Sequence, residues 1–149
     1  MVERSRIEDS MREFIKGTRY FLVGVRLSST GKITVLADTM EGITIDECVE
    51  IHRHLEKVLG QEAGDYEIQV SSPGLDMPFG VIEQYFKNEG KTVVVTDNEG
   101  QKYNGVLKNV TKGGFELETE VKTSGKKKEK KDLSFNFDQV KSTKVHIKI

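Results

Sequence analysis

The side chains that could carry out chemistry in this 149-residue chain are few and scattered. Cys48, His52 and His54 lie within one predicted helix, residues 44–60, and Ser72 follows a predicted strand. Cys48 falls on the apolar stripe of that helix, where a reduced structural thiol is typical. The two histidines are two positions apart, so they point to different sides of a helix and cannot share a metal. Ser72 lacks the G-x-S-x-G nucleophile motif. The sequence therefore predicts no enzyme, no catalytic residue, no metal and no cofactor.

The strongest charge signal is a lysine run in the segment KTSGKKKEKKD, residues 122–132. One interpretation is a solvated loop at the tip of a hairpin. The other is a contact with the phosphates of a nucleic acid. Lysine supplies a point charge and not the planar fork that reads base edges, so we expect recognition of the RNA backbone and little sequence readout. The candidate nucleic-acid-binding residues are Lys126, Lys127, Lys128, Lys130 and Lys131.

The charge is divided unequally along the chain. Residues 1–80 hold nine Lys or Arg and fourteen Asp or Glu, whereas residues 81–149 hold fourteen and ten. This asymmetry predicts two modules that face different partners. The single cysteine excludes an internal disulfide, no apolar run approaches the length of a membrane-spanning helix, and the N-terminus does not resemble a signal peptide. We therefore expect a cytoplasmic protein without membrane contact.

The first half has the periodicity of an α-β-β-α-β domain. The strongest helix signal is the pattern from Thr44, where Thr44 and Glu47 can form a capping box and Gly60 ends the apolar stripe. The predicted helices are residues 3–16 and 44–60, and the predicted strands are residues 20–27, 32–39 and 65–71. This pattern predicts a three-stranded sheet backed by two helices, in an overall α+β fold.

The second half has a short predicted helix followed by short strands with turn signals. Its last two strands are separated by about one helical turn, which favours a small SH3-like or Sm-like β-barrel. The lysine run is assigned to the loop before the fourth of these strands. The predicted helix is residues 79–86, and the predicted strands are residues 91–96, 101–110, 114–121, 132–137 and 142–149.

Both prolines of the chain lie in the stretch VSSPGLDMPF, residues 70–79. Residues 72–75 suit a type II turn, because proline presets φ at its second position and glycine accepts a positive φ at its third. Asp76 can then cap a short helical turn. We expect a stiff corner between an N-terminal domain, residues 1–75, and a C-terminal domain, residues 76–149. The corner residues are Ser71, Ser72, Pro73, Gly74, Leu75, Asp76 and Pro78.

Several segments resemble the bacterial ribosome maturation factor RimP family. The stretch YEIQVSSPGLDMPF is similar to the family's signature, and GITIDECVEIHRHLE resembles its second helix, including the acidic residue–cysteine pair Glu47-Cys48. YFLVGVRL and KITVLADT are similar to its first hairpin, and the pattern from Val93 to Leu107 fits its barrel. The chain departs from the family at Met77, where arginine is usual, and at Phe79, where leucine is common.

The resemblance implies an N-terminal α/β domain, a C-terminal SH3-like barrel and a non-catalytic assembly factor. Such a factor binds the immature small ribosomal subunit, with rRNA and a small-subunit ribosomal protein near the decoding region as partners, and takes no small-molecule substrate. We expect it to act as a monomer. Two alternatives stay open: a general RNA-binding module without a ribosomal role, and an adaptor that binds a peptide strand at the barrel edge. Strong salt dependence without preference for immature subunits would indicate the first, and weak salt dependence the second.

Overall fold

The computed structural model describes residues 1–122, 125 and 128–147. The chain divides into two compact units, Met1–Pro73 and Gly74–Ile149, each with its own hydrophobic core. The predicted domain boundary after Leu75 is two residues from this division. That each unit is an independent domain stays a prediction.

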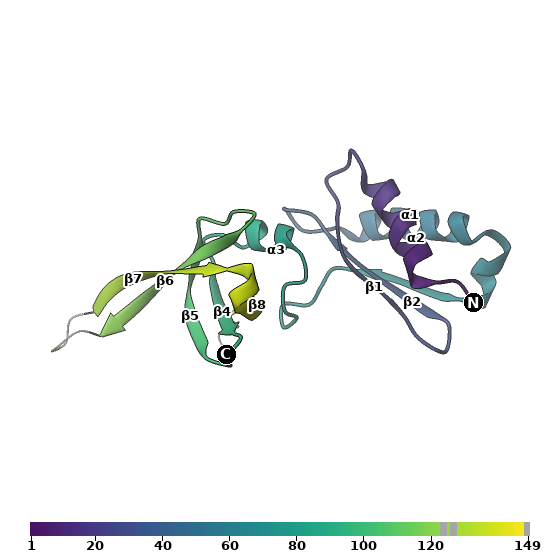
Figure 1. The fold of residues 1–149 in the computed structure, drawn as a ribbon. Coiled ribbons are helices and arrows are strands. Elements are labelled where there is room, and N and C mark those ends of the chain that lie inside the picture. Colours follow the sequence, from purple (N-terminus) through teal and green to yellow (C-terminus); the bar gives the residue numbers. More distant parts are fainter. Residues whose placement is uncertain (123–124, 126–127, 148–149) are drawn as a thin grey trace. The chain divides into compact units, whose positions relative to one another are not determined.

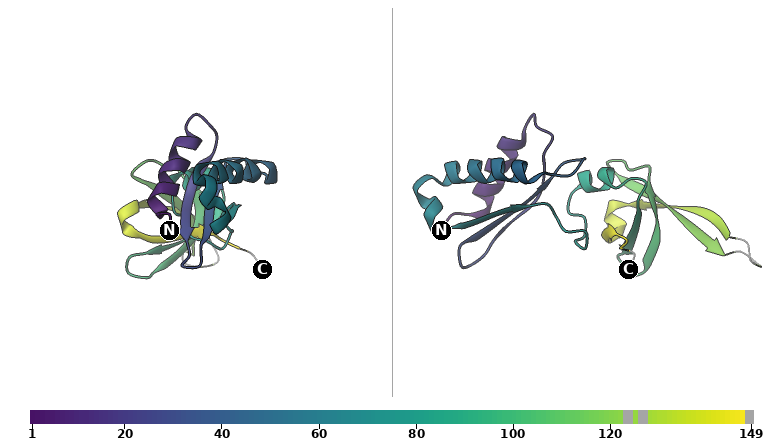
Figure 2. Two further views of the ribbon diagram at one scale, coloured as in Figure 1. Left: turned by 90° about the vertical axis from the view of Figure 1, so that its right-hand side faces the viewer. Right: turned by 180° about the vertical axis from the view of Figure 1, so that it is seen from behind.

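The first unit contains two helices and a three-stranded sheet, as predicted. Strands β1 and β2 form an antiparallel hairpin, and β3 pairs with β2 in parallel, giving the sheet order β1-β2-β3. Both helices lie on the same face of this sheet (Figures 1 and 2). The elements are α1 (Arg4–Ile15), β1 (Phe21–Leu27), β2 (Lys32–Asp38), α2 (Ile45–Leu59), the 3₁₀ helix η1 (Gly60–Asp65) and β3 (Glu67–Ser71).

Helix α2 is the crossover between the two parallel strands. Its residues Ile51, Leu55 and Leu59 recur at four-residue spacing and are buried, so they face the sheet. Gly60 ends the helix with a φ of 59°, a backbone conformation that glycine adopts without steric cost. The rest of the buried core of this unit comes from α1, the sheet and the N-terminal segment: Val2, Ile7, Met11, Val25, Ile33, Val35 and Ala37.

The second unit is a five-stranded antiparallel sheet with one short helix. The strand order is β7-β6-β5-β4-β8, and among the described residues β7 and β8 are opposite edges that do not pair. The mixed α+β class is therefore confirmed, whereas a closed SH3-like barrel stays a prediction. The elements are α3 (Ile82–Lys87), β4 (Thr92–Asp97), β5 (Lys102–Lys108), β6 (Gly114–Lys122), β7 (Lys128–Asn136), the 3₁₀ helix η2 (Phe137–Gln139) and β8 (Val140–Val145).

The assignment of the lysine run to a loop is wrong for its second half. Strand β7 begins at Lys128, so Lys128, Lys130 and Lys131 belong to the strand. Their partner strand β6 carries glutamates at alternate positions, and Glu120 stands opposite Lys130 in the register. Lys128 lies 3.9 Å from Glu120 and Lys130 lies 4.0 Å from Glu118, and such oppositely charged cross-strand neighbours stabilise the strand pair.

The predicted type II turn at residues 72–75 is also wrong. Gly74 does not have a positive φ, and the turn lies two residues later, where the Met77 N–H donates to the Gly74 carbonyl (3.1 Å). A Cβ on Gly74 would be 2.7 Å from the Asp76 carboxylate, so glycine leaves room for that side chain. Asp76 and Pro78 do not start a helix. Helix α3 begins at Ile82.

Unit two packs around an aromatic cluster. The Tyr85 ring has its centroid 4.9 Å from that of Phe137 and 5.2 Å from that of Phe115. The buried Tyr85 hydroxyl donates to Thr143 Oγ1 (2.8 Å), which satisfies both polar groups. Two neighbouring glycines, Gly113 and Gly114, lead into β6 beside this cluster, and neither has a positive φ.

These glycines form a matched pair for mutation. A Cβ on Gly114 would collide with the Phe135 carbonyl and lie 3.0 Å from the Asn136 Cα, whereas a Cβ on Gly113 meets nothing within 4 Å. We expect Gly114→Ala to lower the free energy of unfolding by about 1–3 kcal/mol, because backbone must move. Gly113→Ala should change it by less than about 0.5 kcal/mol. Urea unfolding of both variants tests this, and equal midpoints would contradict the close approach.

Candidate functional site

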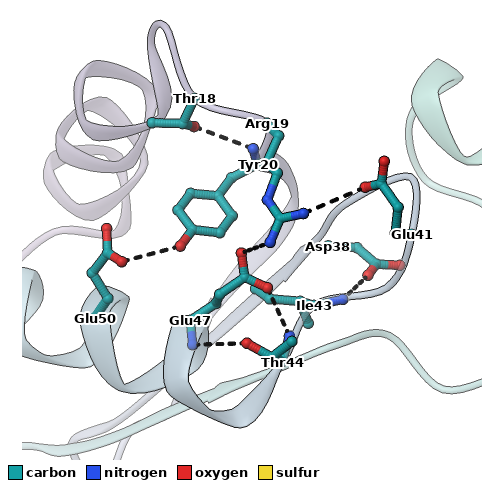
Figure 3. Close-up of polar contacts among 9 residues, drawn as sticks. All are labelled: Thr18, Arg19, Tyr20, Asp38, Glu41, Ile43, Thr44, Glu47 and Glu50. Atoms are coloured by element: carbon teal, nitrogen blue, oxygen red, sulfur yellow. Dashed lines mark hydrogen bonds and ion pairs between the residues drawn. The ribbon is translucent and has the colours of Figure 1, made fainter.

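The start of helix α2 is fixed by a capping box. The Glu47 N–H donates to Thr44 Oγ1 (3.1 Å), and the Thr44 N–H donates to Glu47 Oε1 (3.0 Å), as Figure 3 shows. Two N–H groups that the first helical turn would leave unpaired are thereby satisfied. The capping box predicted from the sequence is confirmed.

A second set of contacts ties the connection before β1 to the same helix. Arg19 donates to Glu47 at 2.5 Å and lies 3.7 Å from the Glu41 carboxylate, and the Tyr20 hydroxyl donates to Glu50 (3.3 Å; Figure 3). The Thr44 backbone N–H, with the Arg19 guanidinium adding to it, lowers the pKa of Glu47. Burial, followed by the charge of Glu50, raises the pKa of Tyr20. No local sequence pattern indicates these contacts, because their partners are about thirty residues apart.

The acidic residues after β2 have separate structural roles. Asp38 is only 6% exposed, and its Oδ1 accepts a hydrogen bond from the Ile43 N–H (3.0 Å). Asp38 is therefore a buried residue that holds the connection before α2 in place. Glu41 is exposed and pairs with Arg19.

The candidate nucleophile and metal ligands are not brought together. Burial raises the pKa of the Cys48 thiol, which disfavours the thiolate. His52 contacts Glu56 (3.0 Å), and His54 contacts Ser10 on α1 (2.9 Å), so the two rings point to different sides as predicted. Within residues 1–122, 125 and 128–147, no three His, Cys, Asp or Glu side chains could hold a metal ion. In the same part of the chain, no helix is long and apolar enough to cross a membrane.

The candidate RNA-binding lysines are distributed over both faces of the β6–β7 hairpin. Lys126 and Lys127 lie outside the described residues. Lys128 is 3.9 Å from Glu120, and Lys130 is 4.0 Å from Glu118. Lys131 faces the opposite side, because successive strand residues alternate. The structure therefore does not gather Lys128, Lys130 and Lys131 into one positive patch.

The outer face of this hairpin is a ladder of mixed charge. Lys108 of β5 lies 2.9 Å from Asp132, and that hydrogen bond raises the pKa of the lysine. Sequence reasoning missed the glutamates Glu116, Glu118 and Glu120, although their alternation in FELETE is the pattern of one strand face. Aligning that pattern against KEKKD as an antiparallel hairpin would have predicted the ion pairs of Lys128 with Glu120 and of Lys130 with Glu118.

The predicted corner residues lie at the junction of the two units along the chain. Ser71 is the last residue of β3, and Pro73 is the last residue of the first unit. Ser72, Gly74, Asp76 and Pro78 are exposed, as is Leu75, an apolar side chain with 70% of its surface accessible.

The chain is similar in sequence to proteins of one family. Residues 10–76 match the RimP N-terminal domain. The chain is 32% identical to a Porphyromonas gingivalis protein, over 87% of each sequence, and 35% identical to a Cytophaga hutchinsonii protein, over 81% of each. Both proteins are named ribosome maturation factor RimP. The chain belongs to the RimP family of ribosome maturation factors.

The pKa of Glu47 gives a pH prediction for the site. Because that pKa is lowered in the folded state, Glu47 contributes stability above its unfolded pKa of about 4.3, and this stability is lost as the pH falls through the folded pKa. Glu47→Gln keeps an oxygen for the Thr44 N–H but cannot titrate.

We therefore expect the parent chain to be more stable than Glu47→Gln at pH 7, and the difference to shrink as the pH falls from about 5 to 3. Urea unfolding of both chains across this range measures the difference, and the other carboxylates cancel in the comparison. A difference that is constant with pH would show that the Glu47 charge has no part in stability.

Proposed function

We propose that this protein acts as an assembly factor, not an enzyme, in the maturation of the small ribosomal subunit. The observation that carries the proposal is 32–35% identity, over 81–87% of the chain, to proteins named ribosome maturation factor RimP. The proposed place of action is the cytoplasm, where ribosomal subunits are assembled. The protein would bind the immature particle, promote its correct folding and leave the mature one.

We propose that the end of the β6–β7 hairpin contacts rRNA phosphates through Lys126, Lys127, Lys128, Lys130 and Lys131. The pairs of Lys128 and Lys130 with glutamates are near 4 Å and exposed. Such surface pairs are typically worth less than about 1 kcal/mol, so a phosphate can compete for these lysines. The acidic first unit, by contrast, suits a basic ribosomal protein, since complementary charge speeds encounter.

For the second unit we propose the SH3-like barrel of the family. The strand order β7-β6-β5-β4-β8 and the 3₁₀ turn η2 between the last two strands are compatible with it. We also propose that the segment Ser71, Ser72, Pro73, Gly74, Leu75, Asp76 and Pro78 restricts the conformations of the chain between the units, because each proline fixes its φ.

The lysine contribution can be measured by salt dependence. We expect Lys128→Gln/Lys130→Gln/Lys131→Gln to reduce the slope of log K against log salt, for binding to purified immature small subunits, by about 2, at about 0.7 per lost phosphate contact. The matched control is Lys16→Gln/Lys32→Gln/Lys57→Gln, which removes the same charge from the first unit. Binding is measured by sedimentation between 50 and 200 mM salt.

Equal slopes for the two triple variants would contradict the hairpin contact. Equal affinity for immature subunits, mature subunits and an unrelated RNA would contradict the maturation role and favour the general RNA-binding module. Salt-independent binding of the parent chain would favour the protein adaptor.

The linking segment can be tested with its prolines. Each Pro→Ala substitution increases the conformational entropy of the unbound chain, which is worth about 0.4–1 kcal/mol per site. We therefore expect Pro73→Ala/Pro78→Ala to weaken binding to immature subunits about four- to thirtyfold. Ser72→Ala, in the same exposed segment, should bind like the parent. Unchanged binding of the double variant would show that restriction of this segment is not used.

A further inference from the structure

Strand β3 has an open edge in the first unit. It pairs only with β2 among the described residues, and the Glu67 N–H donates to the Gly31 carbonyl on that side (3.0 Å). In a parallel pair alternate residues bond to the same neighbour, so Glu67, Gln69 and Ser71 bond to β2. The N–H and C=O groups of Ile68 and Val70 consequently point to the open edge.

Helix α2 presents exposed apolar side chains on one flank. Ile45 is 84% exposed and Val49 is 41% exposed, and they are one helical turn apart. Nine residues, or two and a half turns, separate Ile45 from His54 and Val49 from Val58. Side chains of α1 bond to His54 and to the Val58 carbonyl. Ile45 and Val49 therefore lie on the flank of α2 that faces away from α1.

The exposed flank and the open strand edge are on the same side of the unit. Helix α1 packs over β1, α2 packs over β3, and β1 and β3 are the two ends of the sheet. The flank of α2 opposite α1 is thus the flank above the free edge of β3. We call the side chains of Ile45 and Val49, with the backbone of Ile68 and Val70, the α2–β3 edge surface.

The charges around this surface indicate the chemistry of its partner. The first unit carries nine basic and thirteen acidic side chains. Exposed acidic residues lie on both elements of the surface, Glu56 on the Ile45 flank of α2 and Glu67 on β3, whereas the exposed Arg53 and Lys57 of α2 lie on its solvent side. An extended segment with alternating residues would place one row of side chains on the helix face, against Ile45 and Val49 and near Glu56, and the other row on the opposite face of the sheet, on the side of Glu67.

We propose that the α2–β3 edge surface binds an extended, basic protein segment as a fourth strand of the sheet. The open N–H and C=O groups of Ile68 and Val70 supply main-chain hydrogen bonds, and Ile45 and Val49 supply the apolar contact that selects the segment. Only the source of the segment, a protein of the immature small subunit, rests on the proposed function.

The test uses the full chain and the peptide acetyl-KVKVKVK-amide. We expect amide hydrogen exchange at Ile68 and Val70, followed by NMR, to slow at least about tenfold when the peptide is bound. Ile45→Ser/Val49→Ser should weaken peptide binding at least about tenfold, and both side chains are exposed enough for the variant to fold. Leu75→Ser, an exposed apolar residue outside the surface, is the matched control.

A peptide with N-methyl groups on every residue, which has no N–H group on either edge, should give no protection. An acidic peptide, acetyl-EVEVEVE-amide, should bind at least about tenfold more weakly. Equal binding of the methylated and unmethylated peptides, or equal peptide binding by the Ile45→Ser/Val49→Ser variant and the Leu75→Ser control, would overturn the proposal. Two further results would overturn the proposal. One is protection at Ile68 and Val70 that grows with protein concentration in the absence of peptide, which indicates edge pairing of two copies. The other is protection of the same two amides by an RNA oligonucleotide. Because no ribosomal particle is used, failure here leaves the subunit-binding test intact.

Discussion

The parallel pairing of β2 with β3 is the constraint on which the first unit depends. Adjacent parallel strands cannot be joined by a tight turn, so the chain between them must cross one face of the sheet, here as α2. The capping box at Thr44 and Glu47 fixes where this crossover helix begins. Its starting point in turn decides that Ile51 and Leu55 face the sheet while Ile45 and Val49 stay exposed.

Charge is used differently in the two units. In the first, Glu47 is held by both Arg19 and the Thr44 backbone, so this carboxylate has a structural role at the start of α2. In the second, the acidic and basic residues of the β6–β7 hairpin face each other at 3.9–4.0 Å across one sheet face. A lysine run can therefore belong to a nearly neutral strand surface. Whether its lysines can bind RNA depends on how weak their ion pairs with the glutamates are.

The sequence predicted the features that rest on short-range patterns. The order of elements in the first unit, the capping box at Thr44, the stop at Gly60 and the opposite orientations of His52 and His54 all follow from helical periodicity or local hydrogen bonding. The fold class and the family were also predictable, since the motif around Pro73 is distinctive.

Features that need long-range pairing were missed or wrong. Lys128, Lys130 and Lys131 were assigned to a loop because their charge was considered without Glu118 and Glu120 of β6, which approach Lys130 and Lys128 only in the folded hairpin. The turn at Gly74 was misplaced because glycine there accommodates the Asp76 side chain and not a positive φ. The Arg19 contacts join residues far apart in the chain, and the open edge of β3 depends on which strands pair.

Sedimentation of the tagged full chain from growing cells through a sucrose gradient is the most direct test of a role in small-subunit assembly. If the protein is an assembly factor of the small subunit, it migrates with immature small subunits and is absent from translating ribosomes. If it stays at the top of the gradient, or migrates equally with mature subunits and translating ribosomes, it is not such a factor.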